Sequence, residues 1–329
     1  MFKIRLFAAV AAAALSLAGC GGGGQSPAPI AVSQSAARQS VAQASSAAPA
    51  SMRHVFLSRS RLRQMLSSAA SQPNVKYHQG FIEHTGALYL ILWGFGAGGD
   101  PNNEIPYIES FVQGSEPTSW LNTTTQYYDT VTGSKRYPCL SSSCGNTKAF
   151  LAGVWNDNTD PLPANPISSD AETDEANAGR THFNDWSKQD MFVVVYPSGH
   201  WPDGFVETGG GDCAWHGDSW YYNGTAWQAE PYISLPYMSD AGYECGENDV
   251  NAGSAGTLDG ASIVFGHEIA ETITDPVYFG ASGWYDVNDE EIADKCAWNG
   301  NEFDLSTAYG SFAVQQLWSN KVKSCVSGT

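Results

Sequence analysis

The spacing of apolar and polar residues predicts a sheet with helices packed on it. Residues 87–95 (ALYLILWGF) and 191–196 (MFVVVY) are nearly continuous apolar runs, as expected for strands that are buried on both faces. Shorter apolar or aromatic segments predict the other strands, at 149–155, within 212–238 and at 312–318. Helical spacing and start signals predict helices at 103–112, at 117–128, within 170–189 and at 259–274. This order predicts one α/β domain of the mixed α+β kind, with a mixed sheet and an antiparallel edge strand.

The first residues follow another pattern, which is typical of an export signal. Residues 1–19 combine a positively charged start with an apolar run, 6–17, that is too short to span a bilayer. Residues 17–20 (LAGC) resemble a bacterial lipobox, which implies cleavage before Cys20 and a lipid on its sulfur. An ordinary signal peptide that is cut near the same place is the alternative. We therefore expect an extracytoplasmic lipoprotein held at a membrane, at the outer membrane or the cell surface.

Two further segments are expected before the globular domain. Residues 20–50 are rich in Gly, Ser, Ala and Gln, and they predict a flexible tether. Residues 51–72 contain four arginines and an apolar face, and they predict a basic helix that serves as a stalk. A cleavable pro-segment is the alternative for this stretch. The domain itself is predicted to span 73–329.

Charge is divided unequally between these parts. Residues 20–82 contain six basic and no acidic side chains, whereas residues 83–329 contain eight basic and 34 acidic ones. The net charge of −18 excludes a general nucleic-acid-binding protein, because too few cations remain to neutralise phosphates. An acidic domain is suited to binding cations. Only 15% of the residues are charged and 12% are aromatic, so the chain can bury a core and wholesale disorder is excluded.

The cysteine pattern is typical of a disulfide-stabilised domain. If Cys20 carries a lipid, six of the seven cysteines remain, which is an even number for an oxidising compartment. Pairing of neighbours along the sequence is our choice among 15 connectivities. It predicts the disulfides Cys139–Cys144, Cys213–Cys245 and Cys296–Cys325. A zinc site made of these cysteines is disfavoured because no C-x-x-C spacing occurs.

The segment that carries chemistry is GHEIAE at 266–271, within the predicted helix 259–274. His267 and Glu271 are four residues apart, so they share one helix face and can hold the same metal ion. Glu268 follows the first ligand, as the general base does in the H-E-x-x-H zinc proteases. Here Glu replaces the second His, and carboxylates are competent zinc ligands. An amphipathic helix with solvated carboxylates is the alternative reading of this motif.

The sequence after this helix is strongly acidic, with five acidic residues among the nine from Asp286 to Asp294. A bound cation would relieve the repulsion among them, and Glu291 and Asp294 are the candidates for a third ligand. Asp286 and the more distant His216 are candidates for supporting the ligands. An incomplete calcium loop or a plain acidic surface turn are the alternatives, since the spacing does not fit an EF-hand.

These segments together resemble the EXORDIUM or phosphate-induced protein 1 family of secreted proteins, over about residues 77–325. The similar parts begin with YHQG (77–80) and the strand after it, and include CAWH (213–216). The strongest similarity is in GHEIAETITDP (266–276), followed by WYD (284–286) and EIADKC (291–296). The residues that fall on matching family positions are His267, Glu268, Glu271, Glu291 and Asp294. The resemblance supports the location of the site, whereas the lipobox and basic stalk depart from plant members, and Asp286 falls where those often have a small residue.

The element order also resembles that of the zincin proteases: a mixed sheet, an antiparallel edge strand, and then the active-site helix. We therefore predict a metal-dependent hydrolase, a zinc metallopeptidase with Glu268 as general base, acting on a peptide or a cell-wall polymer. Zinc is the expected cofactor and calcium the alternative. The alternative function is a non-catalytic surface or cell-wall glycan-binding protein with a structural metal, in which exposed Trp and Tyr stack on sugars. A zincin scaffold that has lost its activity is a third hypothesis.

Overall fold

The structure is a computed structural model that describes residues 52–65, 73–116, 118–140, 144, 146, 148–206, 211–278 and 282–329. The expected signal and tether, including Cys20, lie outside the described residues. Within the described part of the chain, no helix combines the length and apolarity that crossing a membrane would need.

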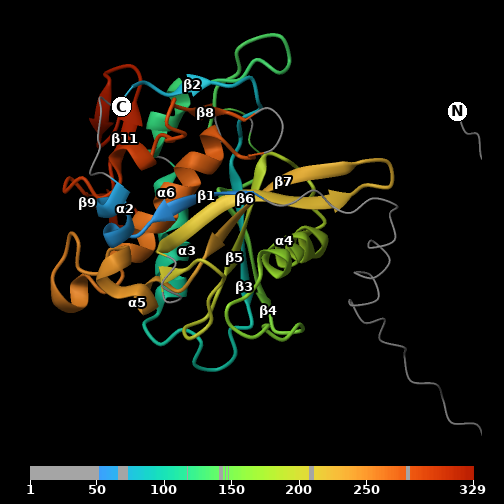
Figure 1. The fold of residues 1–329 in the computed structure, drawn as a ribbon, viewed down its shortest axis with the longest axis vertical. Helices are drawn as coiled ribbons and strands as arrows, with labels where there is room; N and C mark the ends of the chain where they lie inside the picture. The colour runs from blue at the N-terminus through green and yellow to red at the C-terminus, as the bar shows by residue number, and fades with distance from the viewer. Residues whose placement is uncertain are drawn as a thin grey trace, which may run out of the picture. The chain divides into compact units, whose positions relative to one another are not determined.

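A six-stranded mixed sheet forms the centre of the domain (Figure 1). Its strands, in spatial order, are β1 (Arg53–Leu57), β6 (Asp212–Tyr222), β7 (Trp227–Leu235), β5 (Asp190–Val195), β3 (Ala87–Trp93) and β4 (Leu151–Asp157). Strands β7, β5, β3 and β4 run parallel to one another. Strand β6 runs antiparallel to β7, and β1 runs antiparallel to β6. A mixed sheet with antiparallel strands at one side is thus confirmed.

Helices cover both faces of this sheet, which explains why its central strands are apolar throughout. Leu88, Leu90 and Leu92 of β3 belong to the larger core, whereas Tyr89 and Ile91 belong to the smaller one. Figure 1 shows α3 (Glu104–Ser115) and α6 (Asp259–Thr274) on one side of the sheet, and α4 (Ser169–Phe183) on the other. Because successive side chains of a strand point to opposite faces, each strand contributes to both layers.

Shorter elements complete the domain beyond α6 and between the main helices. The paired strands are β2 (Lys76–Tyr77) with β8 (Trp284–Tyr285), β9 (Phe303–Thr307) with β10 (Gly310–Val314), and β11 (Leu317–Ser319) with β12 (Ser324–Val326). The short helices are α2 (Arg59–Met65), η2 (Leu121–Gln126), α5 (Met238–Ala241), η5 (Gly242–Cys245), η6 (Gly253–Ala255) and η7 (Asp294–Cys296). The three expected disulfides are confirmed: Cys139–Cys144, Cys213–Cys245 and Cys296–Cys325.

Two expected elements differ in the structure. The helix expected at 117–128 is only the 3₁₀ turn η2, in which the Thr124 and Thr125 hydroxyls donate to carbonyls three residues earlier. Such local side-chain bonds compete with a regular helix. The strand expected at 312–318 is divided into β10 and β11, because the chain leaves the ladder at Gln315.

The segment expected to be a basic stalk helix, 51–72, requires a larger correction. Residues Arg53–Leu57 form strand β1 at the edge of the central sheet, and only Arg59–Met65 are helical. Phe56 is 1% exposed and belongs to the main core. Phe56 packs into the larger core and Val55 against the smaller one, so successive side chains point to opposite faces of the sheet, as they do in a strand. The apolar residues that suggested one face of a helix therefore belong in part to a pleated strand. Residues 53–65 are therefore packed against the domain and do not form a separate stalk.

Candidate metal centre

Helix α6 places the candidate residues in the interior, and every one of its residues is buried. Ile263 and Ile273 pack into the larger core. Gly266 lets the helix approach Trp120 closely, because a Cβ at this position would lie 2.9 Å from the indole ring. Pro276 follows the helix and has no N–H with which to continue it. The helix is thus held tightly, and His267 has little freedom to move.

A first group of donor atoms comes from α6 and η7. The Nε2 atom of His267 lies 2.9 Å from Oε2 of Glu271 and 3.5 Å from Oδ1 of Asp294. These three donor atoms all lie within 4.8 Å of one another, so a single ion can contact them together. The side chain of Asp294 is 26% exposed, whereas His267 and Glu271 are almost fully buried. The sequence-predicted set of His267, Glu271 and Asp294 therefore converges in space.

Hydrogen bonds fix the far side of both α6 donors. Gln315 donates from Nε2 to the carbonyl of Ala293 at 2.7 Å, so its Oε1 faces Nδ1 of His267 at 3.1 Å and must accept a proton from it. In the neutral ring, Nδ1 then carries the proton, and Nε2 has a free lone pair. Oε1 of Glu271 accepts the backbone N–H groups of Ala293 at 3.1 Å and Asp294 at 2.9 Å. The remaining Oε2 faces the imidazole lone pair, and two acceptors at this distance require a shared proton or a cation.

A second group includes His216 of β6 and shares Glu271 with the first. Nε2 of His216 lies 3.1 Å from the carbonyl of Asp275, which can only accept, so Nε2 carries the proton. Nδ1 is then an acceptor, 3.1 Å from Oε2 of Glu268 and 3.9 Å from Oε2 of Glu271. The other oxygen of Glu268 has no hydrogen-bond partner among the described residues. Glu268 therefore lies beside the donors of the first group, where the sequence places a general base.

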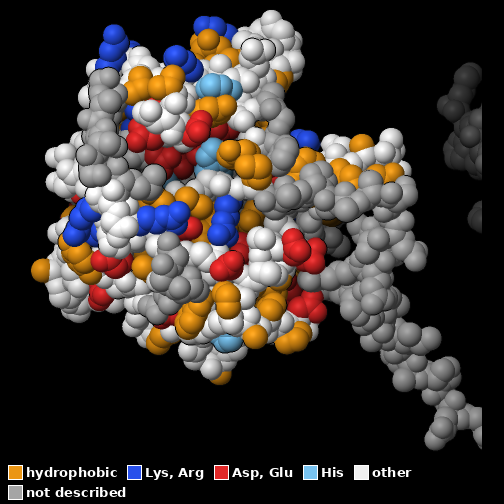
Figure 2. Space-filling view, in the orientation of Figure 1, with side chains coloured by type: hydrophobic (Ala, Val, Ile, Leu, Met, Phe, Trp, Pro, Cys, Tyr) orange, Lys and Arg blue, Asp and Glu red, His pale blue; other side chains and the backbone are white. Residues whose placement is uncertain are grey.

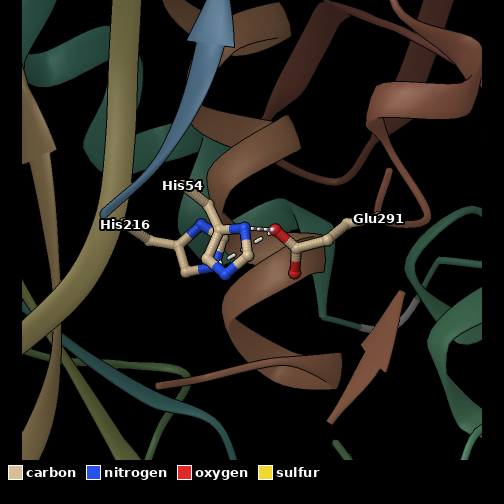
Figure 3. Close-up of side chains that lie close together, drawn as sticks. All are labelled: His54, His216 and Glu291. Carbon is tan, nitrogen blue, oxygen red and sulfur yellow. Dashed lines mark ion pairs between the residues drawn. The ribbon is translucent and has the colours of Figure 1, made fainter. Parts of the chain in front are cut away.

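A third group contains a residue that the sequence analysis missed. His54 of β1 lies with Nδ1 2.9 Å from Oε2 of Glu291, and Nε2 of His216 is 3.6 Å from the same oxygen (Figure 3). The two imidazole rings are stacked, with centroids 5.0 Å apart and planes 8° apart. Glu291 is thus not among the donors around His267. It joins β1 to β6 through two histidines.

The electrostatics of the site reflect buried carboxylates without Lys or Arg partners. Among the described residues, the ion pairs of Glu268, Glu271 and Glu291 are all with histidines. Burial, reinforced by neighbouring carboxylates, raises the pKa of Glu291 well above its usual range, and burial likewise raises the pKa of Glu268. Burial opposes the charge on His267, but Glu271 and other carboxylates outweigh it and raise its pKa to about 9. Burial and the neighbouring His54 lower the pKa of His216 to about 3.

Asp286, expected beside the metal, has other partners. Its Oδ2 lies 2.7 Å from Nζ of Lys295, and both side chains are buried. Its Oδ1 accepts the backbone N–H groups of Asn288 at 2.7 Å and Glu290 at 3.3 Å, which closes a turn. Both carboxylate oxygens are therefore engaged within this turn. The acidic density that suggested a cation at Asp286 is compensated there by Lys295.

Comparisons of the chain with protein-family models, with curated proteins and with solved structures found no match. The resemblance to the EXORDIUM family therefore stays a prediction.

Proposed function

We propose that the protein is a metal-dependent hydrolase whose cation is held by His267, Glu271 and Asp294. The observation that carries this proposal is the contact between Nε2 of His267 and Oε2 of Glu271 at 2.9 Å. Gln315 and two backbone N–H groups occupy the opposite atoms of these side chains. A metal-binding histidine commonly donates its other ring N–H in this way. The site therefore has the hydrogen bonding of a pair of ligands oriented toward a cation.

The donor types favour zinc over calcium. One imidazole nitrogen and two carboxylate oxygens match the ligand classes of catalytic zinc sites with three protein ligands. Calcium prefers six to eight oxygen donors, and an imidazole among the closest donors disfavours it. With three protein ligands, a coordination position remains for water or substrate. This arrangement supports the zincin-like reading of the helix and its edge strand.

Glu268 is the residue that we assign to proton transfer. When bound, the cation would polarise water and lower its pKa toward about 7. Glu268 then takes a proton from the water molecule while the oxygen of that water bonds to the carbonyl carbon of the peptide. The C–N bond breaks as Glu268 gives that proton to the leaving amine, so the products are one carboxylic acid and one amine. Nδ1 of His216, 3.1 Å from Oε2 of Glu268, can accept the proton that this oxygen carries and so holds Oε2 in place. Oε1 of Glu268 has no hydrogen-bond partner among the described residues and faces the reaction.

The alternative of a glycan-binding protein lacks a specific observation in its favour. Trp186 is the only exposed tryptophan among the described residues, at 36% of its surface. The fully or nearly buried tryptophans are Trp93, Trp120, Trp215, Trp284 and Trp318. The tryptophan side chains are therefore mostly buried or half-buried. The lipid anchor at Cys20 and an extracytoplasmic location remain part of the proposal, and both rest on the sequence alone.

Metal content tests the proposed function directly. The full chain should contain about one zinc ion per molecule by mass spectrometry, and the double variant His267→Ala/Glu271→Ala should lose it. His182→Ala, an exposed histidine on α4, is the matched control and should retain the metal. A folded, disulfide-intact chain without metal would overturn the proposal.

The role of Glu268 needs a separate variant. Glu268→Gln should retain zinc but lose turnover of a fluorogenic peptide, because the amide cannot accept the proton. Turnover that persists in Glu268→Gln would exclude Glu268 as the general base even if the metal is present.

A further inference from the structure

The candidate donors are covered by the chain's own N-terminal strand. The ring of Phe56 stacks on that of His267, with centroids 3.8 Å apart and planes 16° apart. Two residues earlier, His54 stacks on His216 and pairs with Glu291 (Figure 3). His267 and Glu268 are 0% exposed as a result of this packing and of the surrounding core. A substrate therefore reaches Glu268 only when β1 moves away, and turnover by the full chain depends on how often this occurs.

Strand β1 lies where any extended chain would pair with this sheet. It is the outermost strand, and it pairs antiparallel with β6 so that His54 lies opposite His216 and Phe56 opposite Ala214. Without β1, β6 would present a row of free backbone groups, which is a template for adding an extended peptide. Gly217 permits this approach, since a Cβ there would lie 2.4 Å from the carbonyl oxygen of Met52.

Charge complementarity holds this segment to the acidic domain. Arg53 donates to the carbonyl of Asp203 at 2.8 Å and lies 3.9 Å above the ring of Trp215. The ion pairs that continue along α2 are Arg59 with Asp249 and Arg61 with Asp212. Figure 2 shows basic side chains gathered over β1 and α2, next to recessed acidic side chains and histidine. The surface under the segment therefore selects a basic chain.

Residues 52–65 are held without a disulfide, whereas strand β6 beneath them is linked by a disulfide to η5. None of the three disulfides involves residues 52–65. Cys213 of β6 is joined to Cys245 of η5, directly beside the residue that pairs with Phe56. The edge of β6 can therefore keep its shape when the segment leaves.

We propose that the edge of β6 beside the donor cluster is a binding groove for an extended basic polypeptide, and that residues 52–65 are its resident, inhibitory occupant. This inference rests on the proposed function, because it names the class of ligand and the regulation of the same site. The occupant defines the pattern that the groove accepts. Side chains at alternate positions face the donors, as His54 and Phe56 do, and arginines flank them.

The test measures peptide binding rather than catalysis. The probe is a fluorescently labelled synthetic peptide with the sequence of residues 52–65, and the receptor is the full chain. In the variant His54→Asp/Phe56→Asp, repulsion from Glu271 and Glu291 and the loss of ring stacking should release the resident strand. Because a tethered strand competes at an effective concentration near millimolar, the variant should bind the probe about 100-fold more tightly than the wild type.

Three controls connect the binding to this groove. Val55→Ala changes the same strand on its other face and should leave the probe excluded. Adding Gly217→Val to the double-Asp variant should abolish binding, since the new side chain would meet the strand backbone. A probe in which Glu replaces every Arg should not bind, and binding of the basic probe should weaken as salt is raised.

The outcomes separate this inference from the proposed function. A folded double-Asp variant that binds the probe no better than the wild type, or an unchanged affinity after Gly217→Val, would overturn the groove even if zinc is present. Binding by a chain that holds no metal would support the groove and overturn only the hydrolase. If the double-Asp variant does not fold, Arg59→Glu/Arg61→Glu is the second variant. It removes the ion pairs of α2 with Asp249 and Asp212 and loosens the segment without altering the donor cluster, and the same binding results then apply.

Discussion

Gln315 accepts a hydrogen bond from the ring of His267 at 3.1 Å, although 48 residues separate them in the chain. The same amide donates to the carbonyl of Ala293, the residue before Asp294. One buried side chain therefore orients a helical donor and also holds the turn that supplies the next one. This link explains how donors from α6 and η7 keep a common geometry.

Replacing Gln315 should weaken metal binding without removing a ligand. Gln315→Leu deletes the acceptor for Nδ1 of His267, which frees the ring to change its tautomer and its orientation. Loss of such a supporting bond typically costs 10- to 100-fold in metal affinity. Competition with a chromophoric zinc chelator measures the change. Gln316→Leu, at the neighbouring and partly exposed position, is the matched control, and equal affinities in the two variants would contradict the assigned role.

The buried ion pair between Lys295 and Asp286 should be essential to stability rather than to metal binding. Lys295→Met leaves the Asp286 carboxylate uncompensated in the interior, which should lower the free energy of unfolding by about 3–5 kcal/mol. The double variant Lys295→Met/Asp286→Asn should lose less, because no charge is left unpaired. Urea unfolding provides the measurement, and the exposed Lys321→Met is the control. A single variant as stable as the double one would show that the pair contributes no coupling.

The main strands and α6 were predictable because the apolar pattern of each segment matches the burial that it has in the fold. Residues 87–93 are apolar at every position, and the strand is indeed buried on both faces. Helix α6 begins and ends where its sequence suggested, with Pro276 after it. The spacing of His267 and Glu271 within a helix determines that they share a face, so part of the candidate site was also accessible from sequence.

Other parts depend on contacts that no local pattern reveals. His54 and Phe56 lie in a short segment that reads equally well as an amphipathic helix, and only pairing with β6 makes it a strand. The run of strand-forming residues before Ser58 was the available signal. Gln315 is one of two adjacent glutamines, and nothing in the sequence indicates which of them faces His267. Asp286 and Lys295 pair across nine residues, a relationship that depends on the turn between them.

Glu172 should make stability depend on pH from a position outside the metal centre. Its side chain is buried on α4, where Oε2 accepts the indole N–H of Trp215 at 2.9 Å. Burial raises its pKa from 4.5 to about 8, although the positive charge of Arg53 opposes this rise. Between those two pH values the folded chain keeps a proton that the unfolded chain releases. The contribution to stability is therefore complete below about pH 4.5 and is lost as the pH rises through 8.

Glu172→Gln should reduce this dependence, because the amide oxygen can still accept from Trp215 but nothing titrates. Over this pH range, the free energy of unfolding of the wild type should fall by on the order of 4 kcal/mol more than that of the variant. Urea unfolding at a series of pH values measures the two slopes. Asp170→Asn, at an exposed position in the first turn of the same helix, should retain the slope of the wild type. Parallel curves for wild type and Glu172→Gln would mean that Glu172 is not protonated in the fold, and the pH dependence would then belong to other buried carboxylates.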